Sequence, residues 1–253
     1  MAEPILVVKD LSKSFGGIVA NQDVGFAVAP GEILGIIGPN GAGKTTLMAQ
    51  LTGEILPDRG TITYLGADIT RAPAHLRAQM GISRCYQITS VFPELTTLDN
   101  VRLGVMAKAG AHFWPWGDAR AETKLRDPAL AALAMVGLEG REDVLAARLS
   151  HGQRRQLELA MALSTNPRLL LLDEPMAGMG PDESQRLTEV IARLKGDKAI
   201  VLIEHDMEAV FALADRITVL DEGRVIASGL PAEIRSDSKV REIYLAEEST
   251  PHA

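Results

Sequence analysis

The sequence has a single cysteine, Cys85, among its 253 residues, so no disulfide can form within the chain. We interpret Cys85 as a small buried side chain of a protein from a reducing compartment. Long apolar runs are also absent. The longest candidate, residues 129–138, is far shorter than the roughly 18 residues of a membrane-spanning helix and suits a core helix. The first residues, MAEPILVVKD, lack the positive charge and long apolar stretch of a signal peptide. We therefore expect no disulfide scaffold, no membrane span and no secretion.

Excess basic charge is missing as well. The chain has 33 Asp and Glu residues against 26 Lys and Arg residues, which gives a formal net charge of −7. Because binding to a phosphate backbone draws on clustered Lys and Arg, this balance argues against a protein that coats nucleic acid. With 46% hydrophobic and 23% charged residues, the composition is globular rather than disordered. The length allows one domain with an added lobe, or two small domains.

Strand-like and helix-like patterns follow one another along the chain. The first third alternates β-rich runs with turns and predicts a small, largely antiparallel sheet from ILVVKDL, VGFAV and EILGIIG. Residues from about 91 to 162 have a helical pattern. After them, apolar runs at 169–172 and 199–203 alternate with amphipathic helices. We therefore predict an α/β fold with a mostly parallel sheet, an N-terminal antiparallel part and an inserted helical lobe.

The strongest motif is GPNGAGKT at residues 38–45, which fits the pattern G-x-x-x-x-G-K-[ST]. An apolar run precedes it and a helical segment follows, as in a phosphate-binding loop. The glycines let backbone N–H groups surround a phosphate at a helix N-terminus. Lys44 is expected to bridge the β- and γ-phosphates, and the Thr45 hydroxyl to bind Mg²⁺. The flanking strand and helix make a plain glycine-rich turn the weaker interpretation.

Acidic residues follow the apolar run at 169–172. Asp173 suits Mg²⁺, through water, and Glu174 suits orienting or deprotonating an attacking water. Without the phosphate loop, a solvated acidic turn would explain them equally well. His205 ends a strand at the same predicted sheet edge and could contact a γ-phosphate, while Gln87 follows another strand and could reach Mg²⁺. Neither residue is specific on its own.

The segment LSHGQ, residues 149–153, precedes a long amphipathic helix. Ser150 and Gln153 fit a capping box, in which the Ser hydroxyl accepts from a backbone N–H and the Gln side chain reaches back. This is the pattern of an ordinary capped helix. It also fits an anion site, because Ser150, the backbone at Gly152 and the helix dipole converge there. The residues leave open whether this site and the phosphate loop face the same nucleotide.

In this order and spacing, the phosphate loop, Gln87, LSHGQ, LLLLDEP and His205 resemble the nucleotide-binding subunit of an ATP-binding cassette (ABC) transporter. The resemblance covers essentially the whole chain and implies a phosphate-loop NTPase core. It makes residues 38–45 the Walker A loop and 169–174 the Walker B motif. It also implies that Phe15 stacks on adenine, although a core residue at a strand end is the alternative for this ring. The implied nucleotide-binding residues are Phe15, Gly38, Pro39, Asn40, Gly41, Ala42, Gly43, Lys44, Thr45 and Thr46.

The resemblance also assigns the family's other site roles to matching positions of this sequence. The catalytic set is Glu174, His205 and Gln87, and the metal set is Thr45, Gln87 and Asp173. The signature residues, which act on the nucleotide of a second subunit, are Ser150, His151, Gly152 and Gln153. The implied layout is one domain, 1–253. Its α/β core with the antiparallel subdomain is 1–87 and 163–253, its helical signature subdomain is 88–162, and a C-terminal helical extension spans about 231–247.

A narrower resemblance links the chain to the ATPase subunits of branched-chain amino-acid importers, with the urea and amide importers similar. It rests on LTTLDNV, IEHDME and the tail PAEIRSDSKVREIYLAEE. Two positions depart from the family pattern. His151 replaces the first glycine of LSGGQ and is expected to tune that contact. Gly180 stands where the family usually has Asp or Asn, a side chain that signals across the dimer.

The resemblance implies partners as well as ATP and Mg²⁺. Two ATPase subunits, identical or paralogous, would close head to tail around two ATP molecules and drive separate transmembrane permease subunits. The permeases are expected on the helical lobe beside Gln87, where Trp114 and Trp116 form either part of that interface or a local loop cluster. A substrate-binding protein would act indirectly, and the location would be peripheral, on the cytoplasmic face of the inner membrane. The alternatives are the ATPase of another ABC system, such as a lipid exporter, and a soluble phosphate-loop kinase or ATPase.

Overall fold

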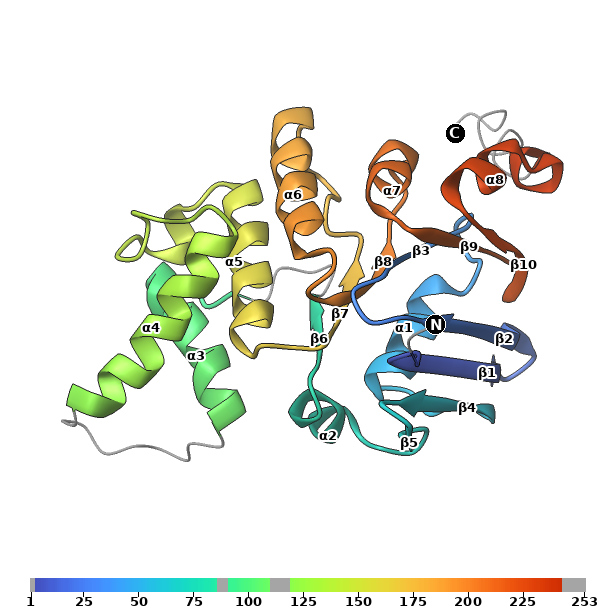
Figure 1. Ribbon diagram of the computed structural model, residues 1–253, viewed down its shortest axis with the longest axis horizontal. Coiled ribbons are helices and arrows are strands. Elements are labelled where there is room, and N and C mark those ends of the chain that lie inside the picture. The colour runs from blue at the N-terminus through green and yellow to red at the C-terminus, as the bar shows by residue number, and fades with distance from the viewer. Residues whose placement is uncertain (1–2, 86–90, 110–118, 243–253) are drawn as a thin grey trace.

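Two β-sheets form the larger part of the molecule, and a group of helices stands at one end (Figure 1). The computed structural model describes residues 3–85, 91–109 and 119–242. Within these residues, no helix is both long enough and apolar enough to cross a lipid bilayer. The α/β class and the mostly parallel sheet predicted from the sequence are confirmed.

The larger sheet has six strands in the order β10-β9-β3-β8-β7-β6. All its pairings are parallel except that between β9 and β10. Every position of β3, β7 and β8 is buried, because helices or the second sheet cover both faces of these strands. Their carboxyl ends meet at one edge, where ligands bind in open α/β sheets. The strands are β3 (Ile33–Ile37), β6 (Ile82–Cys85), β7 (Leu169–Asp173), β8 (Ala199–Ile203), β9 (Arg216–Asp221) and β10 (Arg224–Gly229).

The smaller sheet is antiparallel, with four strands in the order β2-β1-β4-β5. They are β1 (Leu6–Phe15), β2 (Ile18–Val28), β4 (Arg59–Tyr64) and β5 (Ala67–Asp68). The sequence-based placement of residues 33–37 in this sheet is wrong, since β3 pairs in parallel with β8 and β9. The reason is burial. ILGII has no polar position to face solvent, so it fits the centre of a sheet that is covered on both sides.

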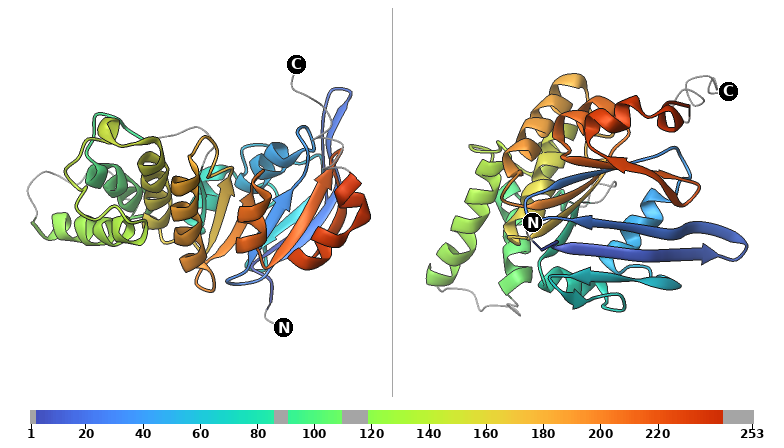
Figure 2. Two further views of the ribbon diagram at one scale, coloured as in Figure 1. Left: turned by 90° about the horizontal axis from the view of Figure 1, so that it is seen from above. Right: turned by 45° about the vertical axis from the view of Figure 1, so that its right-hand side comes forward.

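Helices occupy both faces of the larger sheet (Figure 1). Helix α1 (Lys44–Thr52) lies between the two sheets, and Leu47, Met48 and Leu51 pack into a cluster with side chains of both. On the opposite face lie α6 (Pro181–Leu194), α7 (Met207–Leu213) and α8 (Pro231–Ser236), as both views in Figure 2 show. The short helix α2 (Ala74–Gln79) leads into β6. The predicted C-terminal extension is described only as far as residue 242.

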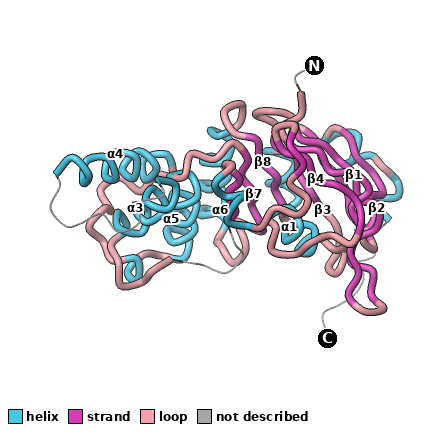
Figure 3. The backbone as a smooth tube through the Cα atoms, turned by 90° about the horizontal axis from the view of Figure 1, so that it is seen from below, coloured by secondary structure: helices cyan, strands magenta, loops and turns pink. Residues whose placement is uncertain are grey.

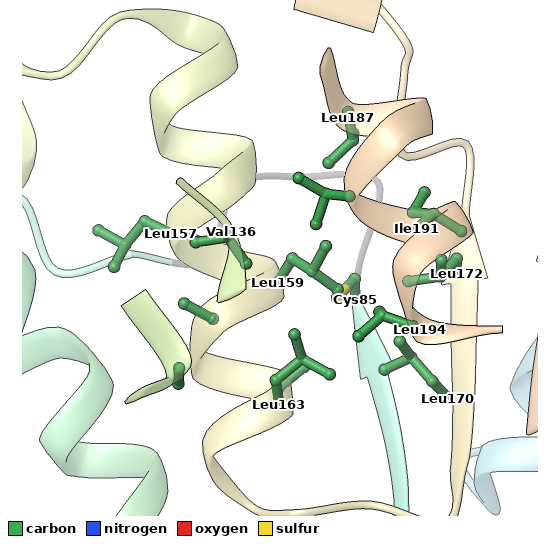
Figure 4. Close-up of a cluster of buried hydrophobic side chains, with 14 of the residues drawn as sticks. Cys85, Val136, Leu157, Leu159, Leu163, Leu170, Leu172, Leu187, Ile191 and Leu194 are labelled. Carbon is green, nitrogen blue, oxygen red and sulfur yellow. The ribbon is translucent and has the colours of Figure 1, made fainter. Parts of the chain in front are cut away.

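The helical lobe consists of α3 (Thr97–Ala109), α4 (Ala119–Met135), the 3₁₀ turn η1 (Ala146–Arg148) and α5 (His151–Ser164). Figure 3 shows this lobe beside the sheet core rather than over it. Helix α5 joins the two parts, because Leu159 and Leu163 point toward Cys85 of β6 and toward the apolar faces of β7 and α6 (Figure 4). Cys85 is buried in this cluster, as the sequence predicted.

Candidate functional site

The phosphate loop connects β3 to α1, as predicted, and close packing requires two of its glycines. A Cβ on Gly43 would lie 2.1 Å from the carbonyl oxygen of Ala20, and Gly43 has a φ of 93°. A Cβ on Gly38 would lie 2.1 Å from the carbonyl oxygen of Leu220. No side chain fits at either position, and the positive φ of Gly43 disfavours other residues further. The loop is therefore held tightly against β2 and the end of β9.

Lys44 begins α1 and turns its amine back into the loop. Its Nζ donates to the carbonyl oxygens of Gly38, at 2.7 Å, and of Pro39, at 2.9 Å. The residue is only 6% exposed. The cation is thus held against two backbone carbonyl groups of the loop, where a bound phosphate would meet it. Thr45, the next residue, is exposed at the helix start.

Two buried amides that sequence reasoning missed support this loop from below. Asn21 of β2 donates from Nδ2 to the carbonyl oxygen of Gly43 at 3.2 Å. Gln50 of α1 donates from Nε2 to Asn21 Oδ1 at 2.7 Å. Both side chains are completely buried. The antiparallel sheet, the loop and α1 are therefore tied together by hydrogen bonds, which a search for local motifs has no means to find.

At the carboxyl edge of the sheet, the structure brings Glu174 and His205 together. Strands β7 and β8 run side by side, and the N–H of Glu174 donates to the carbonyl oxygen of Ile203 at 2.9 Å. The carboxylate oxygen Oε1 of Glu174 lies 2.5 Å from Nε2 of His205. The imidazole is about half exposed, whereas the carboxylate is largely shielded. Glu174 also has a φ of 48°, so its backbone is held in the left-handed region that non-glycine residues rarely adopt.

Asp173, at the end of β7, forms a buried ion pair that the sequence did not indicate. Its Oδ2 lies 2.7 Å from Nη2 of Arg84, on the neighbouring strand β6. Nη1 of the same guanidinium lies 3.0 Å from Glu54 Oε2. Asp173 is 4% exposed. Arg84 thus joins Glu54, the second residue after α1, to the candidate metal carboxylate.

LSHGQ forms the capped helix start that was predicted. Ser150 Oγ accepts from the N–H of Gln153, and Gln153 Oε1 accepts from the N–H of Ser150. Ser150 Oγ also donates to Oε1 of Glu183, at 3.1 Å. A Cβ on Gly152 would meet that carboxylate at 2.6 Å. The carboxylate of Glu183, from the first turn of α6, therefore already lies against the predicted anion site.

The comparisons with known proteins decide the family. A family model described as "ABC transporter" matches residues 21–177, and a second, described as "Branched-chain amino acid ATP-binding cassette transporter", matches residues 224–245. The chain is 38% identical over 255 residues to the high-affinity branched-chain amino acid transport ATP-binding protein LivG of Salmonella typhimurium, with 98% of this chain and 100% of the relative covered.

The chain belongs to the ABC transporter family.

Other relatives and solved structures of this family agree with that assignment. BraF of Pseudomonas aeruginosa, named as a high-affinity branched-chain amino acid transport ATP-binding protein, is 37% identical over 98% of this chain and all of its own. The lipopolysaccharide export ATP-binding protein LptB of Escherichia coli is 35% identical over 96% of this chain and 98% of its own. The ADP conformation of an ABC transporter's ATP-binding cassette superposes with a TM-score of 0.84 at 29% identity, over 96% of this chain and 99% of that one.

Within this ABC cassette, some predicted residues take clear positions and others fall outside the described residues. Phe15 ends β1 with its ring 48% exposed, and the Lys13 ammonium lies 5.4 Å from the ring centroid. The core-residue alternative for Phe15 is therefore wrong. The His151 ring packs near Gly178, and Gly180 is the N-cap of α6 without a side-chain cap. Gln87, Trp114 and Trp116 lie outside the described residues.

Sequence reasoning also missed Glu204, a buried carboxyl group in the loop after β8. Oε1 of Glu204 accepts from the N–H of Met176 at 2.7 Å, and Oε2 accepts from the N–H of His205 at 3.0 Å. Burial raises the pKa of this carboxyl above its ordinary value, although the backbone hydrogen bonds oppose the shift. Only its place directly before His205 could have drawn attention to it.

Proposed function

We propose that this chain is the ATP-hydrolysing subunit of an importer for branched-chain or related amino acids, acting on separate permease subunits. The observation that carries the proposal is the contact between Glu174 and His205 at the carboxyl edge of β7 and β8. The phosphate loop lies at the same edge, after β3, the strand that neighbours β8. The choice of cargo rests on the relatives LivG and BraF and on the family match at residues 224–245.

The nucleotide would lie across the phosphate loop. Lys44 would exchange its two carbonyl partners for β- and γ-phosphate oxygens, which are stronger acceptors for an ammonium. Backbone N–H groups of residues 38–46, other than Pro39, would surround the phosphates, and the exposed ring of Phe15 would stack on adenine. This arrangement accounts for a rigid loop whose cation is oriented before the ligand arrives.

The donor set also fits Mg²⁺. This ion takes one or two protein oxygens together with phosphate oxygens and water, and avoids crowded cages of side chains. The Thr45 hydroxyl and the Asp173 carboxylate are oxygen donors, the kind of ligand that a hard cation such as Mg²⁺ prefers. Magnesium bound there would neutralise charge on the phosphates, and Gln87 is the third residue of the proposed metal set, which would contact the ion directly or through water.

Glu174 would act as the base that orients and deprotonates the attacking water. Its carboxylate is shielded but reachable, and His205 holds one of its oxygens. His205 would in turn face the γ-phosphate, where its ring can donate a hydrogen bond. The chemistry then consists of positioning and electrostatic stabilisation, as is usual for phosphoryl transfer.

The signature residues would complete the site of a second subunit. Ser150 caps α5 and His151, Gly152 and Gln153 form its first turn, so the positive end of the helix dipole and the capping hydroxyl lie at the same place. Two chains, identical or paralogous, would close head to tail on two ATP molecules, each site combining one phosphate loop with the other chain's signature helix. Closure and release would be the step that moves the permeases.

The permeases would dock where the core meets the helical lobe, on the cytoplasmic side of the membrane. A cavity of about 300 Å³ lies there, between α2, β6 and helices α3 and α5, directly before residues 86–90. Trp114 and Trp116 are proposed to contribute to the lobe side of this interface, with a local loop cluster as the alternative. A separate binding protein would deliver the amino acid to the permeases.

The second candidate function is the ATPase of a lipid exporter, because LptB is similar to this chain at slightly lower identity than LivG. Urea and amide importers remain within the same proposed group as the branched-chain amino-acid importers.

The test joins catalysis to assembly. Glu174→Gln keeps the shape of the side chain but removes the base, so hydrolysis should fall by about two orders of magnitude while ATP still binds. Light scattering should then show a shift from monomer to dimer on addition of ATP, because the closed state is no longer discharged. Adding Ser150→Arg should abolish that shift.

A Glu174→Gln protein that hydrolyses ATP at the wild-type rate contradicts the assignment of Glu174, and one that stays monomeric contradicts the homodimer. Copurified chains should have the fold of an amino-acid permease rather than of an exporter.

A further inference from the structure

We propose that Glu204 is a positioning residue for ATP hydrolysis, whose buried carboxylate sets the geometry of the Glu174–His205 pair. The inference rests on the proposed function, because it takes the roles of Glu174 and His205 from there. Neither the family match nor the names of the relatives assigns Glu204 a role.

The two oxygens of Glu204 hold two different loops. Oε1 accepts from the N–H of Met176, two residues after Glu174, at 2.7 Å. Oε2 accepts from the N–H of His205 itself, at 3.0 Å. The first loop leaves β7 and the second leaves β8, and these strands are neighbours in the sheet. Glu204, itself the first residue of the second loop, therefore ties the two loops together at the point where the Glu174 and His205 side chains must meet.

The contact is well shielded from water. Glu204 is 4% exposed and Met176 is 5% exposed. A hydrogen bond to a carboxylate in such surroundings is stronger than one between neutral groups, and a buried N–H without a partner is costly. Water cannot easily replace Glu204 at the Met176 N–H, which lies in this buried contact. We therefore expect the loop after β7 to shift relative to the loop after β8 when the carboxylate of Glu204 is changed.

The residue type matters as well as the burial. A carboxylate offers only acceptors, so both of its oxygens can accept from backbone N–H groups. An amide of the same shape presents an NH₂ to one of the two donors and keeps only the other bond. An aspartate is shorter by one carbon and can serve one loop but not both. These differences give a graded series of variants at one position.

The first measurement separates positioning from binding. Glu204→Gln should lower kcat at least about tenfold, since displacements of about 1 Å in a catalytic group are known to cost as much as a hundredfold. The KM for ATP should stay within about twofold, because the phosphate loop and Phe15 are unchanged. Glu204→Asp, which keeps the charge, should lie between Glu204→Gln and wild type. In each variant, hydrogen exchange should accelerate at whichever of the Met176 and His205 amides has lost its acceptor, which checks the lost bond in the folded protein.

The second measurement is a double-mutant cycle with His205→Ala. If Glu204 acts through the Glu174–His205 pair, Glu204→Gln should lower kcat by no more than about twofold in the His205→Ala background. The control for lost stability is Thr218→Val, a buried polar change on β9 that breaks the contact with Ser228. It should lower the melting temperature but leave kcat within about twofold of wild type.

Each outcome bears on one assignment. Wild-type kcat in Glu204→Gln overturns the role of Glu204, and so does a loss that simply adds to that of His205→Ala or that Thr218→Val reproduces. Wild-type kcat in His205→Ala overturns the role of His205 under the proposed function instead. If Glu204→Gln does not fold, the Glu204→Asp variant decides the question by the same kcat, KM and exchange measurements.

Discussion

Cys85 illustrates how burial controls the chemistry of a single residue. It is 8% exposed, and burial raises the pKa of its thiol to about 12. Since the thiolate is the reactive form, Cys85 should resist alkylation at pH 8 in the native protein. Reaction with a chromogenic disulfide reagent should be slow in buffer and complete within minutes in denaturant. Rapid labelling of the folded chain would show that the cluster around Cys85 opens locally.

Arg84 is a second residue whose surroundings give a sharp expectation. Arg84→Met leaves the Asp173 carboxylate buried without its cation, which should lower the free energy of unfolding by about 3 kcal/mol. Urea denaturation measures this loss. Mg²⁺ with ADP should restore part of it, because a bound cation again neutralises Asp173.

The matched control for Arg84 is Glu54→Gln, which removes only the other arm of the same guanidinium. The side chain of Glu54 is 35% exposed, so this change should lower the free energy of unfolding by less than about 1 kcal/mol. Equal losses in the two variants would contradict the view that Asp173 is the partner that matters for stability.

At the scale of the element, α1 depends on an arginine from outside the helix. The last turn of α1 contains no basic residue, and Arg77 of α2 instead donates to the carbonyl oxygens of Gln50, at 2.6 Å, and Leu51, at 2.8 Å. Burial lowers the pKa of Arg77 to about 10, which still leaves it charged at neutral pH. The cation therefore offsets the negative end of the helix that carries the phosphate loop.

Arg77→Met should lower the free energy of unfolding by about 3 kcal/mol, because several buried carbonyl groups lose their donor. Arg77→Lys should restore little of the lost unfolding free energy, since one ammonium group cannot replace the several N–H donors of a planar guanidinium. Chemical denaturation checks both values. Arg71→Met, at an exposed position in the same segment, serves as the control and should change stability by no more than about 0.5 kcal/mol.

The sequence predicted those elements whose signals are local. The capping box of Ser150 and Gln153 formed as expected, and Leu187, Val190, Ile191 and Leu194 make the buried stripe of α6. The partners of β3 were predicted wrongly, because strand pairing depends on segments more than 160 residues away, such as Ile200 and Ile217. Periodicity describes the face of an element and says little about its neighbours.

At the scale of the whole molecule, one apolar cluster runs from the helical lobe into the sheet core (Figure 4). Leu159 of α5 is 3% exposed at its centre. Leu159→Ala should lower the free energy of unfolding by about 3 kcal/mol, within the range for buried leucines. Because the cluster is shared, we expect one transition by far-UV circular dichroism rather than separate melting of the lobe.

Leu76→Ala is the control for this prediction, since Leu76 is 42% exposed. It should change the unfolding free energy by less than about 0.5 kcal/mol. Two resolved transitions in Leu159→Ala would mean that α5 does not couple the lobe to the core.

The candidate site was predictable in part for the same physical reason. Lys44, Asp173, Glu174 and His205 belong to motifs read along the chain, and parallel strands bring their ends to one edge. Asn21, Arg84 and Glu204 were missed, because each acts by touching a segment remote in sequence. Their residue types carry no signal until the fold shows what they contact.

The carboxylate of Glu183 against Ser150 has a consequence for which anions this surface can accept. A group fixed beside its site competes as an internal ligand, at an effective concentration on the order of millimolar or above. Dissolved phosphate or sulfate at lower concentration would seldom displace it. A phosphate that arrives on the docked face of a second subunit is itself held in place, so it competes on equal terms. The Ser150 site of an isolated subunit should therefore take up few free anions, and under the proposed function it would be filled by a phosphate that a partner presents.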